Sequence, residues 1–468
     1  MRSGYAFFVV GACALPFPIF FVGCGDAPAE PEDAGTEAGS DARPKMEAAP
    51  PLLYVPKEVR CVRGSGSDAG VADTAPPFDA APSDAAGANA DGGADASEAG
   101  PTGHLAAPQA MSSGGILLTD PTIVAISFPN DDLVDEIEDF VASVGCTPYW
   151  RAATSEYGVR EAIAGRPVRL TEAAPEKIDD AQIQKWLAGK LAKHDPAFDP
   201  PKPGILYAIY YPSGTVITEG GAQSCQQFGG YHNDLVLSDG TKVAYAVMPR
   251  CDNFGALFGI DALTGTSTHE FAEAVTDPYP QDAPAFQLPD NDHVVWGVLL
   301  GGEVGDLCVN VNERAFFAPP GYSFVVQRTW SNVAALAGHD PCVPSAAGAY
   351  FQAVPRLTDD VTVSAFGPTV TTKGVIIGLN ASKVIDLNLF SDEPTSGPWT
   401  VSARDGSQFM GGQANLSFTL DKTTGSDGDT IHLTISKTGV NTDLGAEPFA
   451  IVSRIGSRTN TYYGLVGH

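Results

Sequence analysis

The order of apolar and polar positions predicts alternating strands and helices through the middle of the chain. An apolar, β-rich run at 122–128 predicts a strand, and the segment behind it repeats apolar residues at the spacing of an amphipathic helix. A second such helix is predicted over 180–193, and further β-rich runs follow at 205–211 and 243–248. Because the two kinds of element alternate, the pattern favours an α+β (α/β-like) domain over residues 104–345.

Beyond residue 345 the pattern changes to short alternating runs separated by turns. This part has no cysteine and no long helical pattern, so it predicts an all-β sandwich over residues 346–468. No feature of its loops indicates a ligand, and we expect a spacer or an accessory binding module. The predicted strands are 361–366, 375–379, 384–390, 399–403, 416–420, 431–435 and 449–455.

The amino terminus has the pattern of an export signal. An apolar run follows Arg2 and is broken by prolines, which disfavours a membrane-spanning helix. It ends in Val22-Gly23-Cys24, which resembles the bacterial lipobox, where the cysteine becomes the lipidated first residue. We therefore expect residues 1–23 to be a signal peptide and Cys24 to carry a lipid, with an ordinary secretory signal as the alternative. The residue after Cys24 is glycine, which by the same resemblance favours outer-membrane sorting.

Residues 24–103 are rich in Ala, Asp, Pro and Gly and have no apolar periodicity. Such a segment buries too little apolar surface to offset the entropy of ordering, so it predicts a disordered acidic linker. The whole chain has 27 Lys+Arg against 56 Asp+Glu, a net charge of −29, which excludes the class of proteins that grip nucleic acid. We expect a membrane partner through the lipid anchor, and a location in the cell envelope as an outer-membrane lipoprotein or on the extracellular face.

The cysteines indicate a disulfide-bonded body. Of the 8 cysteines, Cys13 leaves with the signal peptide and Cys24 takes the lipid, so six remain in an exported chain. No CxxC pair is present, which disfavours a thiolate zinc site. Of the connectivities open to six cysteines, we predict Cys225–Cys251, Cys308–Cys342 and Cys61–Cys146.

A candidate metal motif lies in a predicted helix that ends before Pro278. His269 and Glu273 are four residues apart and so share one helical face, where an imidazole and a carboxylate can hold one cation. Glu270 beside them is placed to take a proton from an attacking water. This is the HExxH zincin arrangement with its second histidine replaced by glutamate. The alternative is a solvated polar helix face, and Asp277 is either a helix-terminal residue or a supporting group of the site.

Two later segments offer partners for this motif. Glu303 is a candidate third zinc ligand, and Asp306 would orient the first histidine, as in thermolysin-like enzymes. The alternative for both is a loop with local turn hydrogen bonds. His232 follows two glycines in a predicted loop, and it would serve as metal ligand, general acid/base or oxyanion donor, or as a surface hydrogen-bonding residue.

Seven motifs lie along the body: GGILLT at 114–119, TSEYGV at 154–159, SCQQFGGYH at 224–232, YAVMPRC at 245–251, THEFAEAVTDP at 268–278, GEVGDLC at 302–308 and WSN at 330–332 with Cys342. By these motifs the body resembles bacterial members of the exordium (phosphate-induced protein) family over about residues 114–344. The plant proteins for which that family is named act in cell-wall growth and lack the His-Glu helix residues. The resemblance therefore implies an extracellular protein but no chemistry, and the metal site depends on the residues themselves.

The sequence thus favours a zincin-like central domain that acts as a metal-dependent, peptidase-like hydrolase on a protein or cell-surface polymer. Zinc would be held by His269, Glu273 and Glu303, with Glu270 as the base. Because two carboxylates weaken zinc as a Lewis acid, Ca²⁺ is an alternative cation. Two other interpretations stay open: a structural metal, and a non-catalytic surface-binding or signalling module of the exordium type.

The lipid anchor makes a direct prediction. Replacing Cys24 by serine removes the thiol that accepts the lipid, so the Cys24→Ser protein should move from the membrane fraction to the soluble fraction. Detergent partitioning of the wild-type and variant chains measures this. Equal partitioning of the two proteins into detergent would disprove the anchor.

Overall fold

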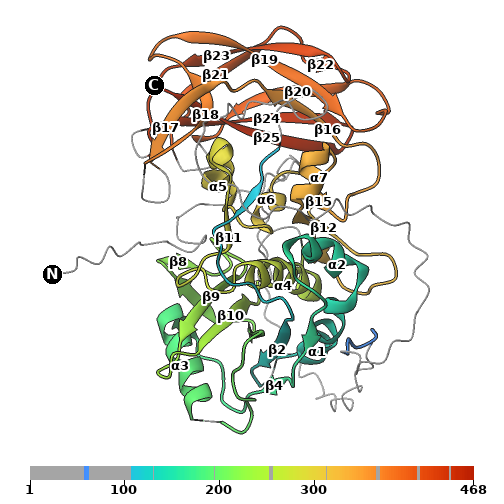
Figure 1. The fold of residues 1–468 in the computed structure, drawn as a ribbon, viewed down its shortest axis with the longest axis vertical. Helices are drawn as coiled ribbons and strands as arrows, with labels where there is room; N and C mark the ends of the chain where they lie inside the picture. The colour runs from blue at the N-terminus through green and yellow to red at the C-terminus, as the bar shows by residue number, and fades with distance from the viewer. Residues whose placement is uncertain are drawn as a thin grey trace, which may run out of the picture.

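The computed structural model describes residues 57–62, 107–129, 131–193, 195–251, 257–312, 314–364, 369–407, 412–441 and 444–468. The predicted signal peptide, the lipidation site Cys24 and most of the predicted linker lie outside the described residues. Among the described helices, none has the length and apolar character needed to cross a membrane. The described chain has a mixed fold, with a helix-and-sheet body below two stacked β-sheets (Figure 1).

A mixed sheet forms the centre of the body. Its middle strands β2 (Thr122–Ser127), β6 (Ile205–Tyr211) and β10 (Lys242–Pro249) run parallel. The short strands β3 (Ile163–Ala164) and β4 (Val168–Arg169) continue the parallel sheet beside β2, and β9 (Tyr231–Val236) closes the other edge antiparallel to β10. Every residue of β6 is buried, as expected for a parallel strand covered on both faces.

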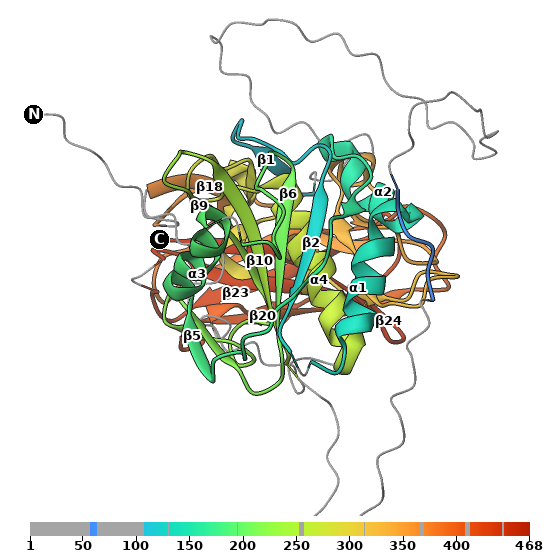
Figure 2. The ribbon, with the colours of Figure 1, turned by 90° about the horizontal axis from the view of Figure 1, so that it is seen from below.

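Helices cover both faces of this sheet. Alternate residues of β6 point to opposite sides, so Leu206 and Tyr210 pack with one set of helices while Tyr207 and Ile209 pack with the other. Figure 2 shows α3 (Asp180–Ala192) on one side and α1 (Val134–Ser143) and α4 (Gly259–Thr276) on the other. α3 begins at a capping box, which satisfies two amide groups at the helix end.

The segment after α4 connects the body to the carboxy-terminal sheets. β11 (Phe286–Pro289) pairs with β1 (Ala110–Ser112) and leads through η3 (Asn291–His293) into α5 (Val294–Leu300) and α6 (Asp306–Val309). In Figure 1, α5 and α6 lie between α4 and the carboxy-terminal strands. The smaller elements of the body are η1 (Val144–Cys146), α2 (Pro148–Thr154), η2 (Ser155–Tyr157), β5 (Lys177–Asp179), β7 (Val216–Glu219), β8 (Ala222–Gln223), β12 (Phe316–Phe317), β13 (Val326–Gln327), β14 (Thr329–Trp330), α7 (Asn332–Ala337) and β15 (Cys342–Val343).

The carboxy-terminal strands form two stacked sheets. Strands such as β23 alternate buried and less buried residues, so each sheet has one apolar face. The apolar faces of the two sheets pack into one hydrophobic cluster. Each of the seven predicted strands overlaps an observed one, although the strand predicted at 375–379 overlaps β18 only at the last two residues of β18. The sequence pattern did not reveal β16, β22 and β25. One sheet has the order β16 (Phe351–Pro355), β19 (Ser382–Ser391), β23 (Thr430–Lys437), β21 (Leu416–Leu420). The other has the order β17 (Asp359–Ser364), β18 (Thr369–Ile376), β25 (Arg458–Gly467), β24 (Glu447–Ile455), β20 (Trp399–Asp405), β22 (Thr424–Gly425).

Three disulfides fasten the body, and they are the three pairs that the sequence predicts. Cys61–Cys146 ties a short amino-terminal segment to the end of α1, and Cys225–Cys251 joins the loops that flank β9 and β10. Cys308–Cys342 holds α6 against β15. Three disulfides indicate an oxidising, extracytoplasmic compartment.

A tryptophan joins the body to the upper sheets. Trp296 of α5 is 2% exposed, and its ring lies 5.4 Å and 5.1 Å from the rings of Tyr462 and Tyr463 in β25. The Trp330 ring is 5.6 Å away on the body side. The two parts of the chain therefore share one hydrophobic core, and α5 is held from above.

Truncating this side chain should destabilise the whole protein. Trp296→Ala leaves a large cavity between the body and β25, and we expect it to lower the free energy of unfolding by about 3–5 kcal/mol. Urea denaturation followed by circular dichroism measures the loss. Phe258→Ala is the control, since Phe258 is 64% exposed and its removal should change stability by no more than about 0.5 kcal/mol. A Trp296→Ala variant as stable as this control would contradict the shared core.

Candidate metal centre

Carboxylate and imidazole groups from three separate segments meet at one place beside α4. The second half of α4 is buried, and the helix packs against β9 and β10 of the central sheet and against β13, so its polar side chains face protein and not solvent. Glu270 is 4% exposed and Glu273 is 3% exposed, which is incompatible with the alternative of a solvated helix face. The groups that converge are His269, Glu270, Glu273 and Asp277 of α4 and its end, His232 of β9, and Glu303 and Asp306 at the start of α6.

The first group in this cluster is centred on His269. Its Nε2 lies 3.3 Å from Glu273 Oε2 and 3.6 Å from Asp306 Oδ1. The ligand atoms of these three residues all lie within 4.8 Å of one another. Ligands at about 2.0–2.1 Å from a tetrahedral zinc are roughly 3.3–3.4 Å apart, so this spacing suits one cation shared by the three side chains.

The ring of His269 is oriented by Gln327 of β13. His269 Nδ1 lies 3.1 Å from Gln327 Oε1, and the Gln327 side-chain nitrogen donates to the Gly305 carbonyl at 2.9 Å. Because the amide nitrogen is committed to a carbonyl, its oxygen accepts from Nδ1–H and leaves Nε2 free to bind a cation. Sequence reasoning missed Gln327, because no motif connects a residue of β13 with the helix that it supports.

His232 is the centre of a second group. Its Nδ1 lies 3.6 Å from Glu270 Oε2 and 3.7 Å from Glu273 Oε2, and its Nε2 lies 3.6 Å from Glu303 Oε1. Ligand atoms of His232, Asp277 and Glu303 also lie within 4.8 Å of one another. The sequence predicts His232 in a loop, but it is the second residue of β9, and its side chain faces α4.

The structure regroups the predicted ligands. The predicted set of His269, Glu273 and Glu303 is not among the three groups with ligand atoms in mutual reach. Asp306 lies with His269 and Glu273 instead, and Glu303 faces His232. Two hydrogen bonds hold Asp306 beside His269 and Glu273. The Asp306 amide donates to Glu273 Oε1 at 3.0 Å, and the Asp306 carboxylate accepts from the Gly302 amide at 3.0 Å.

Gly305 allows this close approach. A Cβ at Gly305 would lie 2.7 Å from Glu273 Oε1 and 2.8 Å from His269 Nδ1, closer than real Cβ contacts. Only a residue without a side chain fits between these groups.

Asp277 combines the two roles that the sequence left open, a helix end and a supporting group. It is the C-terminal cap of α4, and its Oδ1 accepts from the Ala285 amide at 2.6 Å. Its carboxylate thereby lies within the cluster, next to His232 and Glu303.

Burial and like charges shift the protonation of the cluster. Burial, together with the charge of Glu273, raises the pKa of Glu303 and of Asp306 well above their usual values. Burial alone would lower the pKa of His269, but the charge of Glu273 raises it well above its usual value. Burial would raise the pKa of Glu273, yet the charge of His269 lowers it. Without a cation, the cluster therefore retains protons to limit its negative charge.

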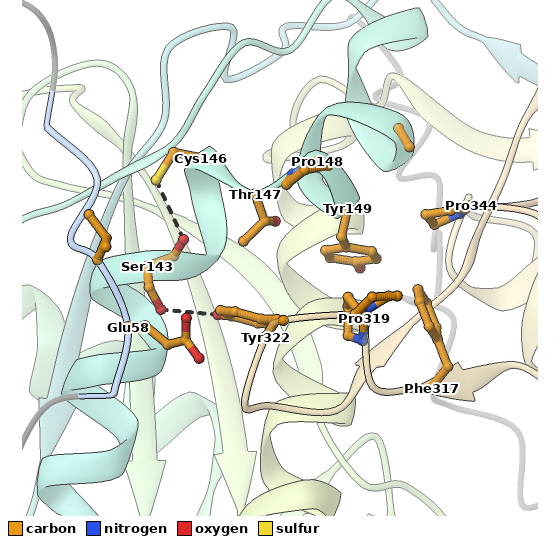
Figure 3. Close-up of a pocket in the computed structure, with 14 residues that line it drawn as sticks. Glu58, Ser143, Cys146, Thr147, Pro148, Tyr149, Phe317, Pro319, Tyr322 and Pro344 are labelled. Atoms are coloured by element: carbon orange, nitrogen blue, oxygen red, sulfur yellow. Dashed lines mark hydrogen bonds between the residues drawn. The ribbon is translucent and has the colours of Figure 1, made fainter. Parts of the chain in front are cut away.

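A separate apolar pocket opens elsewhere on the body. It has a volume of about 430 Å³, and Figure 3 shows Tyr149, Phe317 and Tyr322 along it, with prolines between them. None of its lining residues belongs to the acidic cluster, so this pocket is not part of the candidate metal centre. One contact links the two regions, since the Tyr149 hydroxyl donates to the Gln327 carbonyl at 2.7 Å.

Comparisons with known proteins assign no family to this chain. No family model matches it, and no curated protein matches it. Among solved structures, "Crystal structure of the S-layer protein SbsC domains 4 and 5" is 11% identical, with a TM-score of 0.15, over 25% of this chain and 55% of that one. "Structure of surface layer protein SbsC, domains 1-6" is 12% identical, with a TM-score of 0.15, over 34% of this chain and 19% of that one. Such low TM-scores support no argument, so function must be argued from the residues.

The raised pKa values predict how the metal-free protein responds to pH. Between the unfolded and folded pKa values of Glu303, Asp306 and His269, the folded state binds more protons than the unfolded chain, so stability falls as pH rises. We expect the melting temperature of chelator-treated protein to decrease from about pH 5 to pH 8. Added Zn²⁺ should raise the melting temperature by the largest amount at the higher pH.

Asp306→Asn should flatten this dependence, because it removes one of the repelling charges. Glu393→Gln, which changes an exposed carboxyl on the upper sheets, should leave the slope unchanged. A metal-free protein whose melting temperature is constant or rises over this range would contradict the assignment.

Proposed function

We propose that this chain is a lipid-anchored, extracytoplasmic, zinc-dependent hydrolase that acts on peptide bonds of a protein or of a cell-surface polymer. The observation that carries the proposal is the position of His269 Nε2, 3.3 Å from Glu273 and 3.6 Å from Asp306, with the ligand atoms of all three residues within 4.8 Å of one another. A buried orienting partner, Gln327, accompanies it, as the partners of metal-binding histidines commonly do.

The surrounding architecture supports a zincin-like domain. The motif lies in the buried half of α4, which packs on a sheet of parallel strands closed by one antiparallel edge strand, β9. In such a domain, the helix supplies ligands and base from one face, and a later segment supplies the remaining ligand. The start of α6 with Asp306 fills that position.

Each side chain then has a distinct role. His269, Glu273 and Asp306 would hold the zinc, which when bound supplies a Lewis acid to the scissile carbonyl and to water. Glu270 would act as general base, since burial raises its pKa and a base with a raised pKa accepts a proton more readily near neutral pH. His232, with Nδ1 3.6 Å from Glu270 Oε2, would orient that carboxylate.

The donor set also bears on the cation. An imidazole with two carboxylates suits Zn²⁺ or Mn²⁺, whereas Ca²⁺ prefers oxygen ligands throughout. Two carboxylates place more negative charge on the zinc than two imidazoles would, which makes it a weaker Lewis acid. We therefore expect modest turnover. The anchor at Cys24 and the acidic linker would hold this domain at the cell envelope.

A non-catalytic role is the second candidate, and the burial of the cluster favours it. His269 is 16% exposed and Asp306 14%, while the side chains of His232, Glu270, Glu273 and Glu303 are at most 5% exposed. A cation with so little access to solvent would fasten α4 to α6 in a surface-binding module of the exordium type. In that case the metal stabilises the fold and no substrate reaches it.

Glu270→Gln separates the two functions. The substitution keeps the size of the side chain and the three zinc ligands but removes the base, so metal content should stay near that of the wild type while turnover falls by roughly 10²–10⁴-fold. Metal is measured by inductively coupled plasma mass spectrometry, and turnover with a quenched fluorescent peptide library. Glu219→Gln, a matched change of a partly buried carboxyl outside the cluster, should affect neither. Wild-type protein that holds zinc but cleaves nothing in the library would favour the structural metal.

A further inference from the structure

We infer that the cluster binds a second divalent cation, held by His232, Asp277 and Glu303, next to the cation proposed at His269, Glu273 and Asp306. These two sets share no residue, and the ligand atoms within each set lie within 4.8 Å of one another. This inference rests on the proposed function in one respect only: both cations would occupy the same cluster.

The unpartnered atoms of the second set point to a ligand. His232 has a side chain 5% exposed, and its Nε2 makes no hydrogen bond within the described residues. That atom faces Glu303 Oε1 at 3.6 Å. Asp277 is 0% exposed, and its Oδ2 likewise has no hydrogen-bond partner among the described residues. Buried polar atoms are rarely left unpaired in folded proteins, and a cation between these two would satisfy both.

The charge of the cluster also favours more than one divalent cation. It contains five carboxyl groups, and the two imidazoles are neutral when they act as ligands. With all five carboxyl groups ionised, one divalent cation would leave a net charge of −3 in a buried site, whereas two divalent cations would leave −1 and so displace more of the protons that the metal-free cluster retains. Within the described residues, the only ion pairs of these carboxylates are with His232 and His269, so neither lysine nor arginine compensates them. Buried charge without compensation is strongly unfavourable.

The backbone is built to bring the second histidine to the helix. A Cβ at Gly230, two residues before His232, would lie 2.6 Å from Thr266 Cγ2 and 2.9 Å from Glu270 Oε1. Glycine at this position therefore lets β9 approach α4 closely, and the imidazole of His232 enters the cluster. On the other side, Glu273 Oε2 lies 3.3 Å from His269 Nε2 and 3.7 Å from His232 Nδ1, so this carboxylate stands between the two sets.

The second set takes the same chemical class of cation as the first. One imidazole nitrogen and two carboxylates suit Zn²⁺ or Mn²⁺. Two-metal sites occur in hydrolases that include aminopeptidases, where a second cation would add a Lewis acid for the attacking water or the substrate carbonyl. With a second cation, His232, Asp277 and Glu303 would be metal ligands. In a centre with a single metal they would only support the residues that bind it.

The stoichiometry of zinc measures this directly. The full mature chain in detergent is loaded with ZnCl₂, exchanged into buffer with a weak chelator, and analysed by native mass spectrometry. We expect two zinc ions per wild-type chain, and one in Glu303→Gln and in Asp277→Asn. Glu219→Gln should retain two. The number of zinc ions on the wild-type chain can be interpreted even if a variant fails to fold. Near-ultraviolet circular dichroism shows whether each variant is folded.

Each other outcome has a distinct meaning. One zinc per wild-type chain would overturn the second site and leave the proposed function intact, while no zinc would overturn both. Two zinc ions retained by folded Glu303→Gln and by folded Asp277→Asn would overturn Glu303 and Asp277 as ligands of the second cation.

Discussion

The structure depends on one constraint: five carboxylates and two imidazoles are enclosed beside α4 with almost no access to water. Charges in such surroundings are costly unless they are paired, and here the available partners are two histidines that themselves can bind metal. The raised pKa values of Glu303 and Asp306 express this cost. A cation bound at the centre of the cluster would remove this cost, which is the physical basis of the metal centre that we propose.

The rest of the fold positions the three segments that meet there. The central sheet supports α4 from one side, and β9 brings His232 to it from the sheet edge. The α5–α6 segment, which carries Asp306, is held by Cys308–Cys342 from within the body and by Trp296 packed against β25 from above. The carboxy-terminal sheets thus support the segment that carries Asp306, as well as forming a separate layer of the molecule.

Sequence patterns predicted much of the fold because local rules determine it. β6 has the predicted limits, α3 ends within one residue of them, and the three disulfides pair as expected. The helix with His269 and Glu273 was also predicted, although α4 begins earlier, at Gly259. β16 and β25 were missed, since their burial on both faces hides the alternation that marks a strand exposed on one side.

The detailed grouping of the site could not be read from the sequence. Whether Glu303 or Asp306 meets His269 depends on a single turn at the start of α6 and on the space left by Gly305, which no spacing rule contains. Gln327 contacts His269 of α4, and Asp277 accepts a hydrogen bond from Ala285, so both join segments that no local sequence pattern connects. The residue types were predictable, because carboxylates and histidines at helical spacing indicate metal binding; their pairing required three-dimensional structure.

If this cluster is a metal centre, anomalous X-ray diffraction tests it most directly. Data collected on either side of the zinc absorption edge, from crystals of the zinc-loaded protein, locate the metal independently of the side-chain positions. We expect an anomalous peak about 2.0–2.2 Å from His269 Nε2 and from carboxylate oxygens of Glu273 and Asp306. Crystals grown at saturating zinc that show no anomalous peak within the cluster would contradict the metal centre.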